Sequence, residues 1–582
     1  MIFRPPTSSG VSRLGGFAIG MSSLLHDLPI ILAALALFYA LLSTTHYWLS
    51  PVATHTVIHL QASALPKYAM FSVLRIAFAY VVSLIFSLIY GYIAAYNPRA
   101  EKVMIPLLDT LQSIPVLSFL PGVMVAMITL IPTKQLGVEL GSILLIFTGQ
   151  VWNMSFSFYS SLKSIPREMR EVATVYRWSK WQRFTRLELP YAAIGLIWNS
   201  MMSVAGGWFF LMACEMFVLG DRDLRLPGLG SYLQTAANAG DTRAILLGLA
   251  TMIAVIVLTD QVIWRPVIAW AEKFKFEQVE GTDVPQSPIL DLWRKSRIPP
   301  FLAAALVGPL RERIDLHFAK RAQGHPLDAT PSRARAWITR VIGVAAILGI
   351  AYALVRMIFL LTSLTGSEVR GIFWGAGATF LRVELSLLLG ALWTIPVGVA
   401  IGLRPTLSAI AQPIAQIAAS VPATALFPII LLALIRVRGG LGMGSIVLLL
   451  LGTQWYILFN VIAGAIAIPT DLKEVCSLFA FGTRERWRDL FLPAIFPYLV
   501  TGLVTASGGA WNASIVAEYV HLKGQTFSTV GLGAIISDAT DTGNFAVLLG
   551  ATIVMAALVV TINRLVWRRL YVLAAMKYKM ET

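Results

Sequence analysis

Long apolar runs alternate with short polar segments along nearly the whole chain. A helix needs about 20 apolar residues to cross the hydrocarbon core of a bilayer. The runs that reach or approach this length are residues 29–47, 72–96, 104–131, 137–160, 191–219, 244–268, 336–362, 375–402, 408–435, 442–466, 494–519 and 545–567. The pattern therefore predicts an all-α polytopic membrane protein with about 12 transmembrane helices, six in each half.

The composition supports a membrane protein. Of the 582 residues, 57% are hydrophobic and 13% are charged, whereas soluble domains carry about 25% charged residues. The net charge of +16 is typical of a membrane protein with an excess of cytoplasmic Lys and Arg. Basic and aromatic residues are not interleaved on any soluble stretch, so we expect the lipid bilayer, and no nucleic acid, as a partner.

The two halves of the chain are copies of one unit. Residues 152–230 reappear without a gap as residues 455–533, a shift of 303 positions, and upstream the shift is 307, as from Arg75 to Arg382. Each copy holds a polar, charged segment between its apolar runs. Such self-similarity at a fixed distance is the signature of a duplicated structural unit.

The distribution of Lys and Arg predicts the orientation. Segments 161–189 and 467–492 are rich in both, whereas the loop 48–66 has neither. The positive-inside rule then places both basic segments and both termini in the cytoplasm, and an even number of spans keeps the copies parallel. The predicted parts are a cytoplasmic lead (1–28), a first unit (29–268), a cytoplasmic linker (269–335), a second unit (336–568) and a cytoplasmic tail (569–582).

The basic segment of each copy is predicted to form two short helices. Pro166 and Pro469 suit a first helical turn, and Ser179 with Gln182 resembles a capping box for the second helix. We expect the Leu-Pro pair at the end of each segment to end that helix and begin the next span. A short helix of this kind is suited to a groove on a partner protein. The alternative is a basic loop that merely satisfies the charge rule.

The pattern Glu-x-Ala-x(15)-Leu-Pro in this segment resembles the EAA loop of ABC-importer permeases. Val172 replaces the first alanine, the second copy has Val475 and Cys476, and the glycine of the family is Arg177 or Ala480 here, with Gly482 two positions late. The Ser-Ile-Pro, Ser-Val-Pro and Gly-Leu-Gly turns are most similar to the nitrate, sulfonate, taurine and bicarbonate branch, in a fused, duplicated form. The coupling residues that the resemblance implies are Glu171, Ala173, Leu189, Pro190, Glu474, Gly482, Leu492 and Pro493.

This resemblance implies two parallel six-helix type I permease units in the plasma (inner) membrane, importing a small anion. It also implies two ABC ATPase subunits on the EAA helices and a periplasmic or extracytoplasmic solute-binding protein. The chain has no G-x-x-x-x-G-K-[S/T] loop and no metal-ligand cluster, so we expect no cofactor, metal or catalytic residue here, and ATP with Mg²⁺ in the partner subunits.

Polar residues within the apolar runs are candidates for a substrate path, because charges in a membrane are costly. Arg75 and Arg382 are a repeated pair that could attract an anion, or could instead reach the interface or pair with Glu384 or a backbone carbonyl. Prolines 115, 121, 422 and 428 are predicted to break the third span of each copy. The candidate side chains are Arg75, Arg382, Ser113, Ser420, Gln150, Trp152, Gln454, Trp455, Trp208, Trp511 and Asn512.

Two other functions remain open. A twelve-helix secondary transporter would couple transport to an ion gradient through buried carboxylates, yet few carboxylates lie at span centres. A membrane scaffold or exporter component would need no substrate path of its own. Co-purification of an ATPase distinguishes both from the importer.

Overall fold

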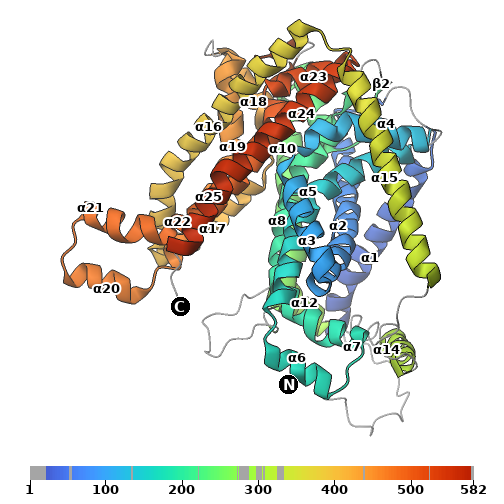
Figure 1. Ribbon diagram of the computed structural model, residues 1–582, viewed down its shortest axis with the longest axis vertical. Coiled ribbons are helices and arrows are strands. Elements are labelled where there is room, and N and C mark those ends of the chain that lie inside the picture. The colour runs from blue at the N-terminus through green and yellow to red at the C-terminus, as the bar shows by residue number, and fades with distance from the viewer. Residues whose placement is uncertain are drawn as a thin grey trace.

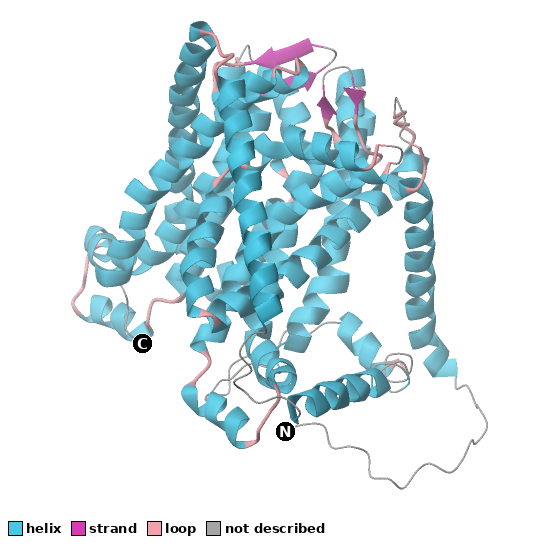
Figure 2. Cartoon of the chain, turned by 45° about the vertical axis from the view of Figure 1, so that its right-hand side comes forward, coloured by secondary structure: helices cyan, strands magenta, loops and turns pink. Residues whose placement is uncertain are grey.

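The computed structural model describes residues 21–51, 56–132, 135–219, 222–271, 273, 288–296, 305, 308–323, 333–436, 440–522 and 525–577. Helices dominate, as the apolar runs predict, and the strands within these described ranges form two short hairpins (Figures 1 and 2). The apolar stretch near residues 298–310 and the first 20 residues lie largely or wholly outside the described residues.

We call residues 29–268 unit one and residues 336–568 unit two. Unit one, with the start of its first helix, contains α1 (Met21–Trp48), η1 (Ala62–Ala64), α2 (Leu65–Tyr96), α3 (Pro98–Ser113), η2 (Val116–Phe119), α4 (Leu120–Leu130), α5 (Leu136–Ser164), α6 (Arg167–Val175), α7 (Lys180–Arg183), η3 (Phe184–Glu188), α8 (Leu189–Glu215), β1 (Val218–Leu219), β2 (Arg222–Asp223), α9 (Leu229–Ala239), α10 (Thr242–Thr259), η4 (Asp260–Trp264) and α11 (Arg265–Ala271). The linker contains α12 (Pro288–Lys295) and α14 (Gly308–Gln323).

Unit two repeats this order. Its elements, with the helices that flank it, are α15 (Arg333–Leu361), α16 (Gly366–Gly402), α17 (Pro405–Ser420), α18 (Ala423–Arg436), α19 (Leu441–Ile466), α20 (Thr470–Leu478), α21 (Thr483–Glu485), η7 (Arg486–Phe491), α22 (Leu492–Ala517), β3 (Tyr519–Leu522), β4 (Gln525–Ser528), α23 (Leu532–Asp541), α24 (Phe545–Ile562), η8 (Asn563–Trp567) and α25 (Arg568–Lys577). Each hairpin is antiparallel, with Val218 paired to Asp223 and Tyr519 to Ser528.

Eight helical spans of the described chain are long and apolar enough to cross a membrane individually: Asp27–Trp48, Ala62–Tyr96, Lys180–Glu215, Thr242–Ala271, Gly366–Gly402, Leu441–Ile466, Thr483–Ala517 and Phe545–Ala574. The predicted runs 137–160 and 336–362 are the long helices α5 and α15. The other two predicted runs are not single helices. The run 104–131 is a pair bent by 88°, and 408–435 is divided at Val421 and Pro422 into α17 and α18.

The proline-containing turns account for these breaks. Pro115 and Pro422 lack the N–H that would continue the helix, and each disfavours helical backbone in the residue before it. Ile114 and Val421 accordingly have extended backbone, with ψ of 131° and 116°. The predicted break of the third span is thus found in both units, at Pro115 and Pro422. Pro121 and Pro428 lie within α4 and α18, so the prediction that they also break the span is wrong.

The two units are parallel and related by an approximate twofold axis. Both hairpins lie at one end of the molecule, while α6 and α20 lie toward the other (Figures 1 and 2). The contacts between units come in matching pairs: α10 contacts α17 as α24 contacts α3, and α9 contacts β3 as α23 contacts β1. This is the arrangement expected of two copies with an even number of spans.

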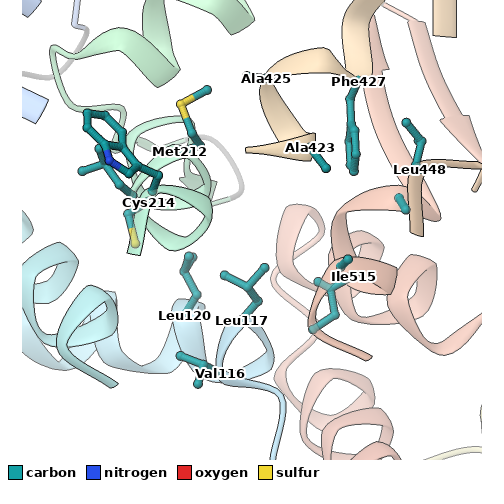
Figure 3. Packing of buried hydrophobic residues seen from close by; sticks show 14 of the residues in the cluster. Val116, Leu117, Leu120, Met212, Cys214, Ala423, Ala425, Phe427, Leu448 and Ile515 are labelled. Carbon is teal, nitrogen blue, oxygen red and sulfur yellow. The ribbon is translucent and has the colours of Figure 1, made fainter. Parts of the chain in front are cut away.

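One apolar core runs through both units. Leu117 of η2 and Ile515 of α22 belong to the same buried cluster, and these two elements are in contact (Figure 3). Burial of such side chains contributes about 25 cal/mol per Å² where water is the alternative. In the bilayer, close packing and hydrogen bonds between helices contribute instead.

Candidate functional site: coupling segments and arginine clusters

We call α6 with α7 coupling segment one, and α20 with α21 coupling segment two. In each segment the two helices are joined by a turn whose residue Arg177 or Ala480 has a positive φ, 48° and 51°. No other non-glycine residue in the described part of the chain has a positive φ. The left-handed turn is therefore kept although glycine is absent from both positions. Gly482 is not the turn residue, because it has φ −65° and precedes α21.

The second helix of coupling segment one begins at the predicted capping box. The backbone N–H of Gln182 donates to Ser179 Oγ at 3.2 Å, and the N–H of Ser179 donates to Gln182 Oε1 at 2.9 Å. Gly482 and Glu485 occupy the matching positions, and the N–H of Gly482 donates to Glu485 Oε2 at 2.7 Å. The capping box is thus confirmed in unit one and half kept in unit two.

The prediction that Leu189-Pro190 ends this helix is wrong. Residues 180–215 form one continuous helical span, and 483–517 form another. A π-helical turn, Phe184–Glu188 or Arg486–Phe491, comes just before each Leu-Pro pair. The wider turn accommodates the proline ring and its missing N–H without breaking the helix. The coupling segments are therefore joined rigidly to the spans α8 and α22.

Each first coupling helix buries one small side chain. Ala173 is 3% exposed and Cys476, at the same place in the repeat, is 6% exposed. Cys476 lies in a cluster with Ile468, Leu490 and Ala494. A small apolar residue is what this packing needs, so cysteine in place of alanine preserves the contact.

The opposite face of each first coupling helix is apolar and exposed. The exposed apolar residues are Val172 and Val175 of α6 and the next residue, Tyr176. The same repeat positions hold Val475 and Leu478 of α20 and the next residue, Phe479. Val175 is 78% exposed and Leu478 is 81% exposed. Glu171 and Glu474 are exposed beside them. Two matching apolar faces, unpartnered within the described chain, are typical of a docking surface.

Arg75 lies in a buried ionic cluster of unit one. Its Nε and Nη2 donate to the two carboxylate oxygens of Glu139, each at 2.7 Å, and its Nη1 donates to Glu215 Oε1 at 2.7 Å and to the carbonyl of Pro227 at 2.8 Å. Ser72 Oγ also donates to Glu215. The arginine is 1% exposed, and its guanidinium is occupied by protein acceptors.

Arg382 forms the related cluster of unit two. Its Nη1 donates to Glu518 Oε1 at 2.9 Å and to the carbonyl of Val530 at 2.7 Å, and its Nη2 donates to Thr529 Oγ1 at 2.9 Å. Thr379 replaces Ser72 as a donor to the glutamate. The partner of Arg382 is therefore Glu518, and not the Glu384 considered from the sequence.

These clusters explain the repeated Gly-Leu-Gly motif. The N–H of Gly230 donates to Glu215 at 2.7 Å, and that of Gly533 to Glu518 at 2.9 Å. A Cβ on Gly228 or Gly531 would lie 2.2 or 2.1 Å from the same carboxylates. Glycine is required there because the start of α9 or α23 approaches the acid too closely for a side chain.

The hairpin end of unit one carries a further ion pair. Asp223 accepts from Arg225 Nε at 2.8 Å, Nη2 at 2.6 Å and the backbone N–H at 3.2 Å. Burial acts to raise the pKa of Asp223, but the hydrogen bonds and the charge of Arg225 outweigh it and hold that pKa below its usual value. The pair stays ionised at neutral pH and fixes the turn that leads into α9.

The other predicted path residues do not converge on one surface. Gln150, Gln454, Trp208 and Trp511 are buried within their own units, and Trp152 and Trp455 are half-buried. The side chains of Ser113 and Ser420 lie outside the described part. Asn512 does contact the other unit: its Oδ1 accepts from the N–H groups of Val116 at 2.7 Å and Leu117 at 3.4 Å.

A polar groove between α5 and α8 was missed by the sequence reasoning. It has a volume of about 450 Å³ and is lined by Asn153, Phe156, Ser157, Ser160, Ser161, Ser164 and Asn199. The four serines recur at i, i+3, i+4 and i+7, so their helical spacing was a usable signal. Ala463, Gly464 and Ala467 replace three of them in unit two. The serine lining of the groove is therefore not repeated in unit two.

The described part of the chain forms no metal site. No group of three His, Cys, Asp or Glu side chains meets there. Both cysteines, Cys214 and Cys476, are buried and unpaired.

The comparisons with known proteins agree with the duplication. The family described as "Binding-protein-dependent transport system inner membrane component" matches residues 87–262 and 394–572, one stretch in each unit and together more than half of the chain. The bicarbonate transport system permease protein CmpB of Synechococcus elongatus is 30% identical over 212 residues, 36% of this chain and 73% of the relative.

Two further relatives carry similar names. The nitrate import permease protein NrtB of Leptolyngbya laminosa is 29% identical over 197 residues, 34% of this chain and 67% of that protein. The taurine transport system permease protein TauC of Escherichia coli is 30% identical over 185 residues, 31% of this chain and 61% of that protein. Each alignment is shorter than one of the two units.

Proposed function

Because the chain belongs to the binding-protein-dependent transport system inner membrane component family, we propose that it is the membrane subunit of an ATP-driven importer for a small anion. Two ATPase subunits would dock on α6 and α20 from the cytoplasm, and ATP with Mg²⁺ would be bound by them. A solute-binding protein would deliver the anion at the end of the molecule that carries the two hairpins. Both chain termini would then be cytoplasmic.

The observation that carries this proposal is the pair of exposed apolar faces on α6 and α20. The same three repeat positions are apolar and exposed in both units, next to an exposed glutamate. Isolated helices of nine residues have little stability of their own in water. Their exposed apolar side chains therefore fit a cleft on a protein better than they fit solvent.

The rigid connection to α8 and α22 supports a mechanical role. A displacement of α6 or α20 passes through the turn and the π-helical segment into a span that lines the contact with the other unit. Movement of the two coupling segments by their partners would thus change how the units meet. Alternating access by rigid-body movement of packed bundles is an established type of transition.

The anionic substrate is supported by the relatives, whose names refer to nitrate, bicarbonate and taurine.

Co-purification tests the proposal directly. The full chain, expressed together with its genomic neighbours and solubilised in detergent, is expected to bring down an ATPase. Val175→Asp combined with Leu478→Asp should lower the amount recovered at least about tenfold, a loss of about 1.4 kcal/mol in binding. Glu171→Arg with Glu474→Arg should have the same effect.

The matched control is Thr174→Asp with Ser477→Asp. These exposed residues occupy equivalent repeat positions on the same two helices but lie outside the apolar face, so we expect recovery within twofold of the unaltered chain. The importer proposal fails if the unaltered chain recovers no ATPase. The docking assignment fails if the Val175 and Leu478 variant still recovers it in full.

A further inference from the structure

The second arginine cluster lacks one carboxylate that the first has, and this leaves part of Arg382 without an acceptor among the described residues. Glu139 of α5 corresponds to Gly442 of α19, since the neighbouring Gly141-Ser142 corresponds to Gly444-Ser445 in the same register. In unit one the Glu139 carboxylate binds the Nε and Nη2 edge of Arg75. In unit two glycine supplies no acceptor for that edge.

The donors of Arg382 can be counted. Both N–H groups of Nη1 have acceptors, Glu518 and the carbonyl of Val530. One N–H of Nη2 donates to Thr529 Oγ1. The Nε N–H and the second N–H of Nη2 have no acceptor among the described residues. An arginine edge of this kind prefers two parallel hydrogen bonds to an oxyanion.

The Nε and Nη2 edge of the Arg382 guanidinium is accessible from outside the protein. The side chain of Arg382 is 13% exposed, compared with 2% for Arg75. A Cβ on Gly442 would meet only Thr529 Oγ1, at 3.6 Å, so the space that Glu139 fills in unit one is open in unit two. Thr529 Oγ1 accepts from Arg382 and retains its own O–H to donate.

The charges of the two arginine clusters also favour an anion beside Arg382. Unit one combines one guanidinium with two carboxylates, whereas unit two combines one guanidinium with one carboxylate. Binding of one monoanion at Arg382 would give unit two the same set of charges as unit one. An anion there replaces the interaction that the protein builds for itself in the other copy.

We propose that the Nε and Nη2 edge of Arg382, with the Thr529 hydroxyl and the space over Gly442, binds one small oxyanion. Thr529 follows β4 directly, so the site lies at the hairpin end of unit two. The identification of this oxyanion with the transported substrate rests on the proposed function, but the binding site does not. Arg75 forms no such site, because Glu139 occupies its edge.

Titration calorimetry on the purified full chain, without ATPase subunits, tests the site. Sodium nitrate and sodium bicarbonate are the probes, with sodium chloride holding the ionic strength constant. We expect one saturable site per chain for at least one of these oxyanions. Gly442→Glu should weaken binding at least tenfold, because the new carboxylate can take the Arg382 edge as Glu139 takes that of Arg75. The same variant should raise the thermal unfolding temperature, which distinguishes occupation of the site from misfolding.

Met443→Glu is the matched control. It adds the same charge at the next residue, whose side chain is 74% exposed, so we expect affinity within twofold of the unaltered chain. The proposal is overturned if the unaltered chain shows no saturable site, if Gly442→Glu binds as tightly as before, or if both variants lose binding equally. Because no ATPase takes part, this result is independent of docking on α6 and α20.

Discussion

At the scale of single residues, the left-handed turns at Arg177 and Ala480 have the same backbone conformation although their residues differ. Arg177 and Ala480 adopt a conformation that costs about 1–2 kcal/mol for a residue with a Cβ. The turn is nevertheless the same in both units. Each closes with a hydrogen bond from the N–H of the residue that follows the left-handed one, Trp178 to the carbonyl of Ala173 and Phe481 to that of Cys476. The exposed apolar face depends on this turn, which fixes α6 and α20 against the spans.

Glycine at these two positions should strengthen the coupling segments. Relief of about 1–2 kcal/mol of strain, less about 0.5–1 kcal/mol for the added flexibility of the unfolded chain, leaves a gain of about 0.5–1 kcal/mol. Arg177→Gly and Ala480→Gly should therefore slow amide hydrogen exchange in α6 and α20 by about two- to fivefold. Thr174→Gly and Ser477→Gly, inside the same helices, should speed it up. Faster exchange in the turn variants would contradict the assignment of strain.

At the scale of elements, the broken span of unit one is completed by the other unit. The turn after α3 leaves the N–H groups of Val116 and Leu117 without helical partners, and Asn512 of α22 accepts from both. Its own Nδ2 donates to the carbonyl of Gly508. The corresponding residue of α8 is Phe209, which has no such acceptor. One of the two breaks is thus capped across the interface, and the cap must be released if the units separate there.

Asn512→Leu should loosen the region that this cap holds. Two buried N–H groups would lose their acceptor, at a cost of about 1–3 kcal/mol. Amide exchange over residues 116–130 is expected to rise by about tenfold or more. Phe209→Leu, at the matching position of unit one, should leave exchange over residues 423–436 unchanged. Unaltered exchange in the Asn512 variant would show that the cap contributes nothing to the fold.

The duplication of the chain made some elements predictable from the sequence, but features present in one copy alone were missed. The duplication, the parallel units, the capping box at Ser179 and the breaks after Ser113 and Ser420 follow from local turn chemistry and spacing. Glu139 was not predicted, because it lies 64 residues from Arg75 and is absent from the second copy, so a search for shared residues passes over it. The π-helical turns were also missed, since a Leu-Pro pair read locally predicts a helix end.

At the scale of the whole molecule, the two coupling segments have similar helices but different contacts with the rest of the chain. Buried Glu188, in the π-helical turn that follows coupling segment one, accepts from Arg183 of that segment and from Tyr96, each at 2.6 Å. The linker helix α14 also reaches this segment, where Asp315 accepts from Trp181 Nε1 at 2.9 Å. In unit two Phe491 and Leu403 replace Glu188 and Tyr96 and pack against an apolar cluster. The two units have therefore diverged in these contacts, which are hydrogen bonds in unit one and apolar packing in unit two.

The parallel arrangement makes a prediction about the two faces of the membrane. Val175 and Leu478 are exposed on the coupling segments, whereas Val530, 65% exposed, is at the hairpin end. In a Cys214→Ala, Cys476→Ala background, a membrane-impermeant maleimide should label Val530→Cys in intact cells. If the proposed orientation holds, with the basic segments in the cytoplasm, it should label Val175→Cys and Leu478→Cys only in inside-out vesicles. Both native cysteines are buried, so the background chain serves as the unlabelled control. Labelling of Val175→Cys and Leu478→Cys from opposite sides would mean that the units are antiparallel, and no pair of cytoplasmic ATPases could then dock on both.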